Sequence, residues 1–384
     1  MKATINAADL RGFLKSAKPF VSNKVIPILE TVQFKAAGNR VTVTVTDLEN
    51  FFQVHMPAAV DDPGEVCLPF SDLAGFIQTC KDHVLNIEAD QSGKANISGF
   101  KLQGQGIEYG DNGERINQFP ELPELTDTQT LDFSPLLFHE LNVASNFLSK
   151  DDVRPVMTGA NIAKRNGLLT IAATDAHRLY KAEICPYDND FNIIINGLAV
   201  RQVPKVFDTT ANVTVQFNES NAVFEQRGIR LISRLIDGRY PDINAVIPQD
   251  NPVQVTFDKK QLAAAINQVK IAANKKANQV VFTVADGRCK LYACDIDMGT
   301  EMETTIPCRG EGEIEIAFNY KLLLDMLAQQ LSPEITLELS NANRAGVIKE
   351  YHRTYLLMPV MIVKPEEAEA EAEMEEEYEE EEAE

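Results

Sequence analysis

The sequence predicts an α+β fold of three similar domains in tandem. The first observation is a helical pattern that occurs three times, after the polar residues Asn6, Ser134 and Asp258, which are 128 and 124 residues apart. The second is that apolar and polar residues alternate between the helical segments, as in half-buried strands. The third is a content of 44% hydrophobic residues in 384, enough for several buried cores. Helices on one face of antiparallel sheets satisfy all three observations.

Each copy of the helical pattern has the features of a capped amphipathic helix. The polar residue before each helix can accept hydrogen bonds from free N–H groups of the first turn. An apolar residue lies four positions after each cap (Leu10, Phe138, Leu262). A second helix is expected inside each third, beginning near Ser71, Asn196 and Asn319, which are 125 and 123 residues apart. The chain therefore divides into six half-units, each with one helix and several strands.

Strands and turns are predicted between these helices. Alternating patterns occupy residues 41–45, 213–217, 253–257 and 314–318. Turns are predicted at Asn166-Gly167, Asp237-Gly238 and Asp286-Gly287. Segments rich in proline and polar residues at 120–130 and 248–252 are expected linkers. The expected domains are residues 1–125, 126–250 and 251–363, followed by a disordered acidic tail at 364–384.

The charge distribution argues against a strongly basic nucleic-acid-binding protein. The chain has 57 acidic and 36 basic residues, a net charge of −21. Residues 366–384 alone hold 13 glutamates and no base, so the remainder carries −8. A local basic surface is still compatible with these numbers. No apolar stretch is long enough for a membrane helix or a secretory signal, and the six cysteines form no CxxC pair. We therefore expect a cytoplasmic protein with reduced thiols.

Signatures of catalysis are weak throughout the sequence. Gly104, Gly106 and Gly110 approach a GxGxxG motif but have the wrong spacing and open no helix, so a hairpin turn is the favoured interpretation. Asp175 and His177 could form an acid–base pair, but a nucleophile at suitable spacing is missing. The other histidines are isolated. No metal site, cofactor or catalytic residue is predicted.

Basic residues recur on the repeated helices although the protein is acidic. They are Arg11, Lys15, Lys18, Lys81, Lys150, Arg201, Lys205, Lys259, Lys260, Lys270, Lys275, Lys276 and Lys321. Ordinary solvated helix faces are one interpretation. The alternative is a sequence-neutral surface for phosphates, built by repetition. No motif for reading base sequence is present.

Three further motifs carry a resemblance to a known family. They are ATDAHRL at residues 173–179, LIDGRYPD at 235–242 and YLLMPV at 355–360, accompanied by DLE at 47–49 and DVR at 152–154. In this order, and with repeats of about 125 residues, the chain resembles the bacterial DNA sliding clamps, the beta subunits of the replicative DNA polymerase III. The resemblance covers residues 1–363.

The resemblance implies a ring without enzymatic activity. In this family two protomers join head to tail into six similar domains, with helices lining a central channel and sheets outside. Duplex DNA passes through the channel independently of sequence, and a clamp loader ATPase opens the ring. The clamp tethers the replicative polymerase and other proteins through short linear motifs. Here the implied channel residues are Arg11, Lys15, Lys24, Lys81, Lys150, Arg154, Arg201, Lys205, Lys259, Lys270 and Lys321.

The family's peptide-binding pocket, which lies between its second and third domains, can be carried over residue by residue. The corresponding residues are Met157, Thr174, His177, Leu179, Pro241, Val246, Leu356, Met358, Pro359 and Val360. For the dimer interface the resemblance suggests Lys101 opposite Asp297, Glu301 and Glu303. Ala176 replaces the glycine commoner in the family, which we expect to narrow the pocket.

The acidic tail and the overall function leave alternatives open. The tail could filter peptide binding, recruit a basic partner or simply increase solubility. Besides a clamp, the chain could be an enzyme that uses Asp175 and His177, or a monomeric scaffold that binds peptides without enclosing DNA. The sequence does not distinguish a bacterial from a virus-encoded clamp.

Overall fold

The computed structural model describes residues 1–21, 26–81, 83–105, 118–187 and 189–362. Three predictions concern residues outside these ranges. They are the disorder of residues 364–384, the role of Lys24 in the DNA channel, and the hairpin turn at Gly106 and Gly110. None of the described helices is long and apolar enough to cross a membrane.

The chain forms two compact units, each described here by itself. Unit 1 contains Met1–Ser145, Asp151–Ala163 and Asp190–Arg239. Unit 2 contains Asn146–Lys150, Lys164–Asn189 and the chain from Tyr240 onward. The middle third of the sequence therefore contributes to both units. The three-domain boundaries expected from the repeats stay a prediction.

Unit 1 is built around one large antiparallel sheet. Its strand order is β8-β7-β6-β1-β4-β16-β15-β14-β9, with β2, β3 and β5 paired beside β4. The strands are β1 (Lys2–Asn6), β2 (Thr31–Ala37), β3 (Arg40–Thr46), β4 (Asn50–Asp62), β5 (Gly64–Pro69), β6 (Val84–Ala89), β7 (Lys94–Ile97), β8 (Phe100–Gln103), β9 (Gln129–Phe133), β14 (Val213–Phe217), β15 (Asn221–Gln226) and β16 (Ile229–Arg234). Strand β10 (Ala160–Arg165) separately pairs with β13 (Asn192–Ile195).

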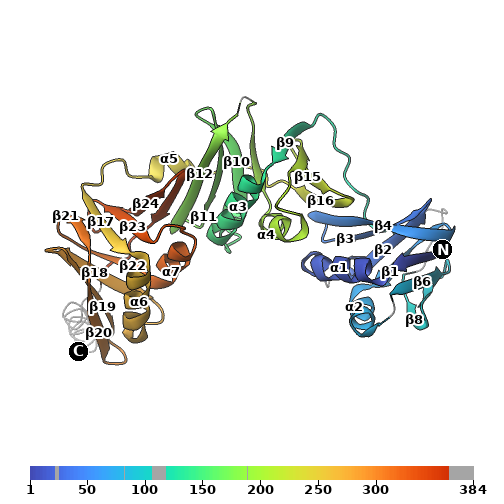
Figure 1. Cartoon of the computed structure of the whole chain (residues 1–384), viewed down its shortest axis with the longest axis horizontal. Helices are drawn as coiled ribbons and strands as arrows, with labels where there is room; N and C mark the ends of the chain where they lie inside the picture. Colours follow the sequence, from blue (N-terminus) through green and yellow to red (C-terminus); the bar gives the residue numbers. More distant parts are fainter. Residues whose placement is uncertain (22–25, 82, 106–117, 188, 363–384) are drawn as a thin grey trace, which may run out of the picture. The chain divides into compact units, whose positions relative to one another are not determined.

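The helices of unit 1 pack in pairs beside these strands (Figure 1). They are α1 (Ala7–Ala17), α2 (Phe70–Thr79), α3 (Pro135–Ala144) and α4 (Gly197–Val206). Helix α1 contacts α2, and α3 contacts α4. Stacked rings of Phe13, Phe20 and Phe52, with centroids 5.4 Å apart in each stack, join α1 and its following turn to β4. Burial of these large apolar side chains fixes the helices on the sheet.

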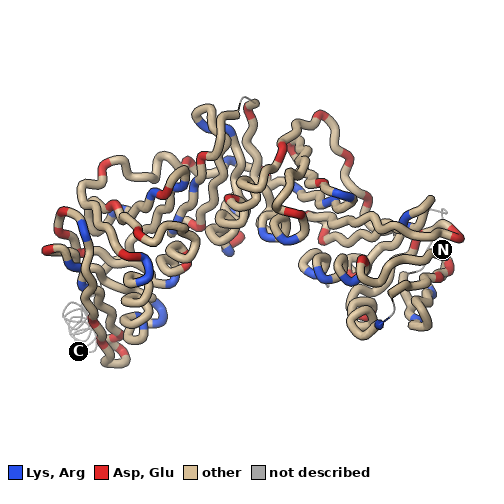
Figure 2. Tube along the Cα trace, in the orientation of Figure 1, with Lys and Arg blue, Asp and Glu red and all other residues tan. Residues whose placement is uncertain are grey.

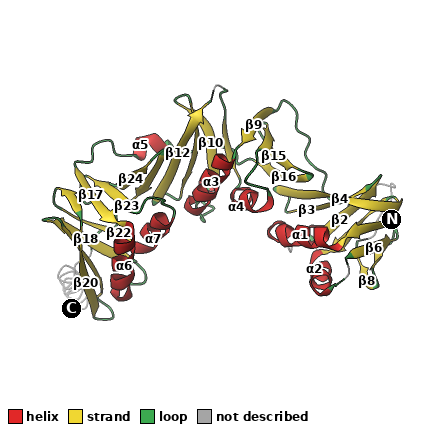
Figure 3. Ribbon diagram, in the orientation of Figure 1, coloured by secondary structure: helices red, strands yellow, loops and turns green. Residues whose placement is uncertain are grey.

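Unit 2 contains two antiparallel sheets. One has the order β11-β12-β25-β24-β23-β17-β21, and the other β20-β19-β18-β22. The strands are β11 (Leu168–Thr174), β12 (Arg178–Pro186), β17 (Val253–Asp258), β18 (Gln279–Ala285), β19 (Arg288–Asp295), β20 (Thr300–Pro307), β21 (Arg309–Glu311), β22 (Ile314–Asn319), β23 (Glu334–Leu339), β24 (Gly346–Glu350) and β25 (Arg353–Leu357). Helices α6 (Lys259–Val269) and α7 (Tyr320–Ala328) pack on each other, and α5 (Ile243–Val246) is a single turn (Figure 3).

All six predicted helices are confirmed, and five of them have the predicted N-cap. Asn6, Ser134, Asn196, Asp258 and Asn319 are N-caps whose side chains accept a backbone N–H in the first turn. The helix expected to begin near Ser71 begins at Phe70, so Pro69 and not Ser71 is its N-cap. The φ of Pro69 is fixed near the helical value, which allows the helix to start without a side-chain cap.

The predicted strands are confirmed, and the predicted turns are confirmed at two of three places. Asn166-Gly167 and Asp286-Gly287 have positive φ at both residues, as tight hairpin turns require. Asp237-Gly238 joins no two paired strands, because it lies in the loop between β16 and α5. Gly238 is needed there for a different reason: its φ is +129°, and a Cβ would lie 2.8 Å from Val156 Cγ1.

Candidate functional site

An apolar surface in unit 2 is assembled from three segments that are distant in the sequence. Strand β12 pairs with β25, which places Leu179 opposite Leu356. The chain continues beyond β25, and the N–H of Met358 donates to the carbonyl oxygen of His177 at 2.7 Å. The turn before β12 and the segment after β25 therefore lie side by side.

The third segment, residues 240–246, is held against the same strands. The N–H of Thr174, at the end of β11, donates to the hydroxyl oxygen of Tyr240 at 3.1 Å. Lys181 Nζ of β12 donates to Asn244 Oδ1 of α5 at 3.0 Å. These two bonds fix Pro241 and α5 beside β11 and β12.

Burial divides the predicted peptide-binding residues into a floor and an exposed face. Thr174, Leu179 and Leu356 are buried, so their first role is packing. The exposed residues are His177, Val246 (54% exposed) and Met358 (39% exposed), and Pro241, Pro359 and Val360 are half-buried. Met157 differs from the other nine, since it belongs to unit 1 and is buried there. An exposed apolar face with a flexible methionine suits varied peptide side chains.

The side chain of Arg178 forms the ionic contacts of the turn beside this face. Its Nε lies 3.0 Å from Asp175 Oδ2 and its Nη1 3.4 Å from Asp325 Oδ2 on α7. Its Nη2 donates to the carbonyl oxygen of Asn146 at 2.7 Å, and the guanidinium lies 5.1 Å from the Phe147 ring centroid. A buried guanidinium needs such partners, because an unpaired charge is costly in the interior.

The proposed acid–base pair of Asp175 and His177 is not formed. Asp175 Oδ1 accepts the backbone N–H groups of His177 and Arg178, and its Oδ2 pairs with the Arg178 side chain. Both oxygens of the Asp175 carboxylate therefore form bonds that stabilise the turn. The two residues also lie in a turn and not in a strand, because β11 ends at Thr174 and β12 begins at Arg178.

Ala176 adopts the left-handed conformation in this turn, with φ of +74°. Glycine reaches this region without steric cost, whereas a Cβ costs about 1–2 kcal/mol there. The side chain is exposed. The main consequence of alanine in place of glycine at position 176 is therefore backbone strain.

The predicted DNA-facing bases lie mainly in the end turns of helices and in the segments beside them. Figure 2 shows where all lysines and arginines occur along the chain. In unit 1, Arg11 on α1 donates to the carbonyl oxygens of Ile77 (3.4 Å) and Cys80 (3.0 Å) at the end of α2. The other exposed bases of this set in unit 1 are Lys15, Lys81, Arg154 and Lys205, and Arg201 is half-buried. Arg11 is oriented by the carbonyl groups of α2, which favour a positive charge.

The remaining bases of the set belong to unit 2. Lys150 and Lys321 are exposed, whereas Lys259 and Lys270 are half-buried. Lys259 Nζ donates to the carbonyl oxygen of Gln330 at 2.7 Å, and Lys270 Nζ to Asn267 Oδ1 at 2.5 Å. Lys259 therefore also holds α6 to the segment after α7, a structural role that its charge alone did not indicate.

Each unit presents a strand at the edge of a sheet. Strand β8, with the exposed Lys101, ends the sheet of unit 1, and β20, with Glu301 and Glu303, ends the smaller sheet of unit 2. Asp297 lies in the turn between β19 and β20. Edge strands carry N–H and C=O groups that can pair with another strand. The two edges also carry opposite charges.

Comparison with known proteins gives matches along almost the whole chain. Family models for the DNA polymerase III beta subunit match residues 1–109 (N-terminal domain), 139–242 (central domain) and 244–363 (C-terminal domain). The chain belongs to the family of DNA polymerase III beta subunits, the bacterial sliding clamps. It is therefore a DNA sliding clamp that supports replicative processivity, with DNA and a polymerase as partners, and it is not an enzyme.

Individual sliding clamps are distant relatives in sequence and close ones in fold. The beta sliding clamp of Bacillus subtilis is 25% identical over 366 residues, which are 91% of this chain and 96% of that protein. That of Staphylococcus aureus is 24% identical over 369 residues, 92% of this chain and 96% of that protein. The crystal structure of the Pseudomonas aeruginosa beta subunit is 21% identical with a TM-score of 0.85, covering 94% of this chain and 100% of that chain. These likenesses give the enzyme and scaffold alternatives no support.

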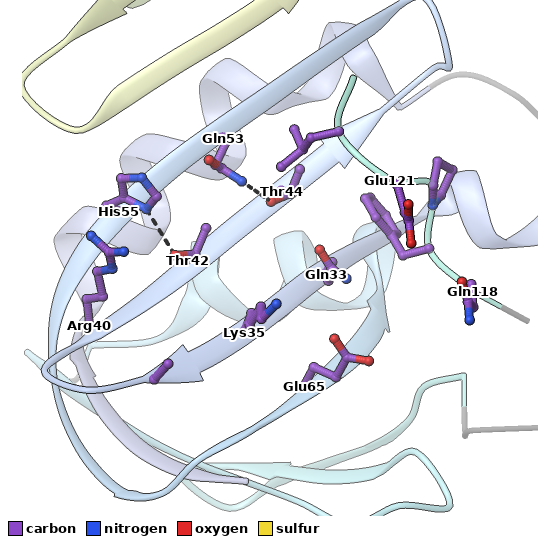
Figure 4. Close-up of a pocket in the computed structure, with 14 residues that line it drawn as sticks. Gln33, Lys35, Arg40, Thr42, Thr44, Gln53, His55, Glu65, Gln118 and Glu121 are labelled. Atoms are coloured by element: carbon purple, nitrogen blue, oxygen red, sulfur yellow. Dashed lines mark hydrogen bonds between the residues drawn. The ribbon is translucent and has the colours of Figure 1, made fainter. Parts of the chain in front are cut away.

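A polar hollow in unit 1 is separate from the surfaces that clamp membership explains (Figure 4). It has a volume of about 520 Å³ and lies over β2, β3 and β4 beside residues 118–122. His55 Nδ1 is hydrogen bonded to Thr42 Oγ1 at 2.9 Å, and Gln53 Nε2 donates to Thr44 Oγ1 at 3.2 Å. Burial, followed by the charge of Arg40, lowers the pKa of His55 from its ordinary value. His55 is half-buried, and its bond to Thr42 gives it a packing role.

The cysteines are free thiols, as predicted. Cys67, Cys289 and Cys308 are buried, and burial raises the pKa of Cys289 to about 12. Such a thiol is protonated and unreactive near neutral pH. Within the described parts of the chain, no group of His, Cys, Asp and Glu side chains is arranged to hold a metal ion.

Proposed function

We propose that two copies of this chain close head to tail into a ring around duplex DNA. The observation that carries this proposal is the pair of edge strands with opposite charge, β8 with Lys101 and β20 with Glu301 and Glu303. Pairing of β8 from one copy with β20 from the other would satisfy the free backbone groups of both edges. Two such contacts, related by a twofold axis, would close the ring.

In the ring, DNA would be held by topology with weak phosphate contacts. The basic helix residues identified above, including Lys24 outside the described ranges, would face the duplex. Contacts from scattered lysines and arginines are electrostatic and independent of base sequence. Such contacts permit sliding, because no single phosphate is held tightly.

The apolar surface of unit 2 would dock the linear motifs of partner proteins. It is formed by residues 174–179, 240–246 and 356–360. His177, Val246 and Met358 supply its exposed face, and the buried residues beneath keep that face in shape. The ring would keep a weakly bound polymerase at high local concentration near its template.

A clamp loader ATPase and other proteins with clamp-binding motifs would be further partners. The protein would act in the bacterial cytoplasm and without a cofactor. The domain boundaries would be 1–125, 126–250 and 251–363.

Solution mass by light scattering across a dilution series tests ring closure. The expected mass is twice the 42.6 kDa of one chain, and it should persist on dilution. Lys101→Glu, or Glu301→Lys with Glu303→Lys, should shift the mass towards one chain, because like charges would then face each other. Mixing the two variants should restore the mass of two chains, because both interfaces of the mixed ring then pair opposite charges. A mass of one chain at every concentration of the unaltered protein would contradict the proposal.

A further inference from the structure

The described chain ends at an anchored position in unit 2. The N–H of Val360 donates to the carbonyl oxygen of Ala317 on β22 at 2.9 Å. Gln279 Nε2, at the start of β18, donates to the carbonyl oxygen of Met361 at 2.8 Å. The segment that follows β25 is thus fixed to the β18–β22 pair before the acidic tail begins.

Three lysines are held at this same end of the β18–β22 pair. Gln279 is paired with Asn319, whose side chain caps α7 by accepting the N–H of Lys321 at 3.0 Å. The turn before β18 is held by Asn274, whose Oδ1 accepts the N–H of Lys276 at 2.9 Å. The carbonyl oxygen of Asn278 accepts the N–H of Tyr320 at 2.8 Å, which joins this turn to α7. Lys275, Lys276 and Lys321 are called the lysine cluster below.

The lysine cluster carries positive charge that has no acidic partner within the described ranges of the chain. All three side chains are exposed, and none forms an ion pair with a described residue. Three exposed bases elsewhere in unit 2 are paired with acids: Lys290 with Glu303 (3.5 Å), Arg309 with Glu334 (2.5 Å), and Lys349 with Glu338 (2.8 Å). An anionic group is therefore the complementary ligand for the cluster.

The acidic tail supplies anionic glutamates, and a short segment connects them to Met361. Four residues, 362–365, separate Met361 from the first of 13 glutamates in residues 366–384. Fully extended, these four residues span roughly 14 Å at about 3.5 Å each. A tether of this kind gives a local concentration of about a millimolar, so many weak ion pairs become effective together. The C-terminal family model ends at residue 363, so the tail lies beyond the part shared with the family.

We propose that the glutamates of residues 366–384 dock on the lysine cluster of their own chain and compete there with DNA phosphates. Lys321 belongs to the proposed DNA-facing set, so the competition rests on the proposed clamp function. The tail then acts as an internal DNA mimic, which weakens contacts between the ring and DNA at low salt. Because the competing charges are exposed, salt screens the effect.

Carbodiimide cross-linking of the full-length protein, read by mass spectrometry, tests the docking. The reagent joins a lysine amine to a carboxylate with which it is in contact. Cross-links from residues 366–384 should concentrate on the lysine cluster, disappear at high salt, and disappear in the Lys275→Ala, Lys276→Ala, Lys321→Ala triple variant. Lys290 and Lys349 are matched controls, because both are exposed but already paired.

Three patterns would overturn the docking. The first is cross-linking spread equally over the controls, and the second is cross-linking confined to Lys181 beside the apolar surface. The third is cross-links found only between copies when 15N-labelled and unlabelled proteins are mixed. None of these readouts requires DNA, so docking can be judged even if the clamp function fails.

The competition with DNA has its own test. A chain that ends at Pro365 should bind duplex DNA several-fold more tightly than the full chain at low salt, with no difference at high salt. The triple lysine variant should remove most of this effect of truncation. Equal DNA binding with and without the tail would overturn the competition. Absence of DNA binding in both chains, with cross-links still on the cluster, would instead refute the clamp function.

Discussion

The hydroxyl of Tyr240 links two parts of the apolar surface through a single atom. Tyr240 is 4% exposed and its hydroxyl oxygen accepts the N–H of Thr174, which is 7% exposed. Burial raises the pKa of Tyr240 above its ordinary value, so the group is a neutral phenol at all working pH values. The Tyr240→Phe substitution removes the acceptor and changes little else.

The expected cost follows from leaving a buried donor without a partner. Such a donor costs about 1–3 kcal/mol, because it has lost water and gained no replacement. We expect local opening at the end of β11 to become easier by this amount. Exchange of the Thr174 amide hydrogen should then accelerate by roughly 5- to 150-fold, at about 1.4 kcal/mol per factor of ten. Residues 241–246 should become more mobile as well, since they follow Tyr240 directly.

Hydrogen exchange is the suitable assay because it reports opening locally. A chain of two units is not expected to unfold in one step, so a single melting temperature would be harder to interpret. Tyr351→Phe is the matched control, since Tyr351 is 87% exposed and its change should leave exchange unaltered. Unchanged protection of Thr174 in Tyr240→Phe would show that the bond does not hold this surface together.

Three further predictions concern single residues. Ala176→Gly should stabilise the turn between β11 and β12 by about 1 kcal/mol, because φ of +74° strains alanine. Hydrogen exchange of the amides in this turn measures the change, and faster exchange would contradict the prediction. Burial lowers the folded pKa of His55 from its ordinary value, so its contribution to stability is present above the ordinary pKa and is lost as pH falls through the folded pKa. His55→Gln should therefore flatten the fall in unfolding free energy towards acid pH, and a parallel pH profile would refute the assignment. His177→Ala and Met358→Ala should each weaken binding of a clamp-motif peptide by roughly tenfold, measured by calorimetry. The control Tyr351→Ala should leave the peptide affinity unchanged. If both variants bind the peptide as tightly as the unaltered protein, these residues do not belong to the docking face.

The repeated helices could be predicted because their signals are local. Asn6, Ser134 and Asp258 cap the helices that they precede, as the chemistry of an oxygen-bearing side chain beside free N–H groups dictates. The sequence predicts Ser71 as the cap of α2, because a hydroxyl can accept an N–H group. The N-cap is instead Pro69, which acts through its fixed φ and offers no side-chain acceptor.

The candidate site could be predicted only through the family resemblance. The contact between Thr174 and Tyr240 spans 66 residues, and that between Arg178 and Asp325 spans 147. No periodicity or propensity reports such pairings. The motif around Asp175 and His177 suggested catalysis because the partner of the carboxylate, Arg178, looked like an ordinary charged neighbour in the sequence. Its burial became evident only with the packing of Phe147 and α7 around it.

The central claim, that the protein encircles duplex DNA, is tested most directly by topology. Protein loaded on a nicked circular plasmid with a clamp loader and ATP is passed over a sizing column in high salt, before and after one cut in the plasmid. The account predicts that protein stays with the circle, is lost after linearisation, and is retained again when the new ends are blocked by bulky groups. Equal retention on circular and open linear DNA, or none on either, would contradict it.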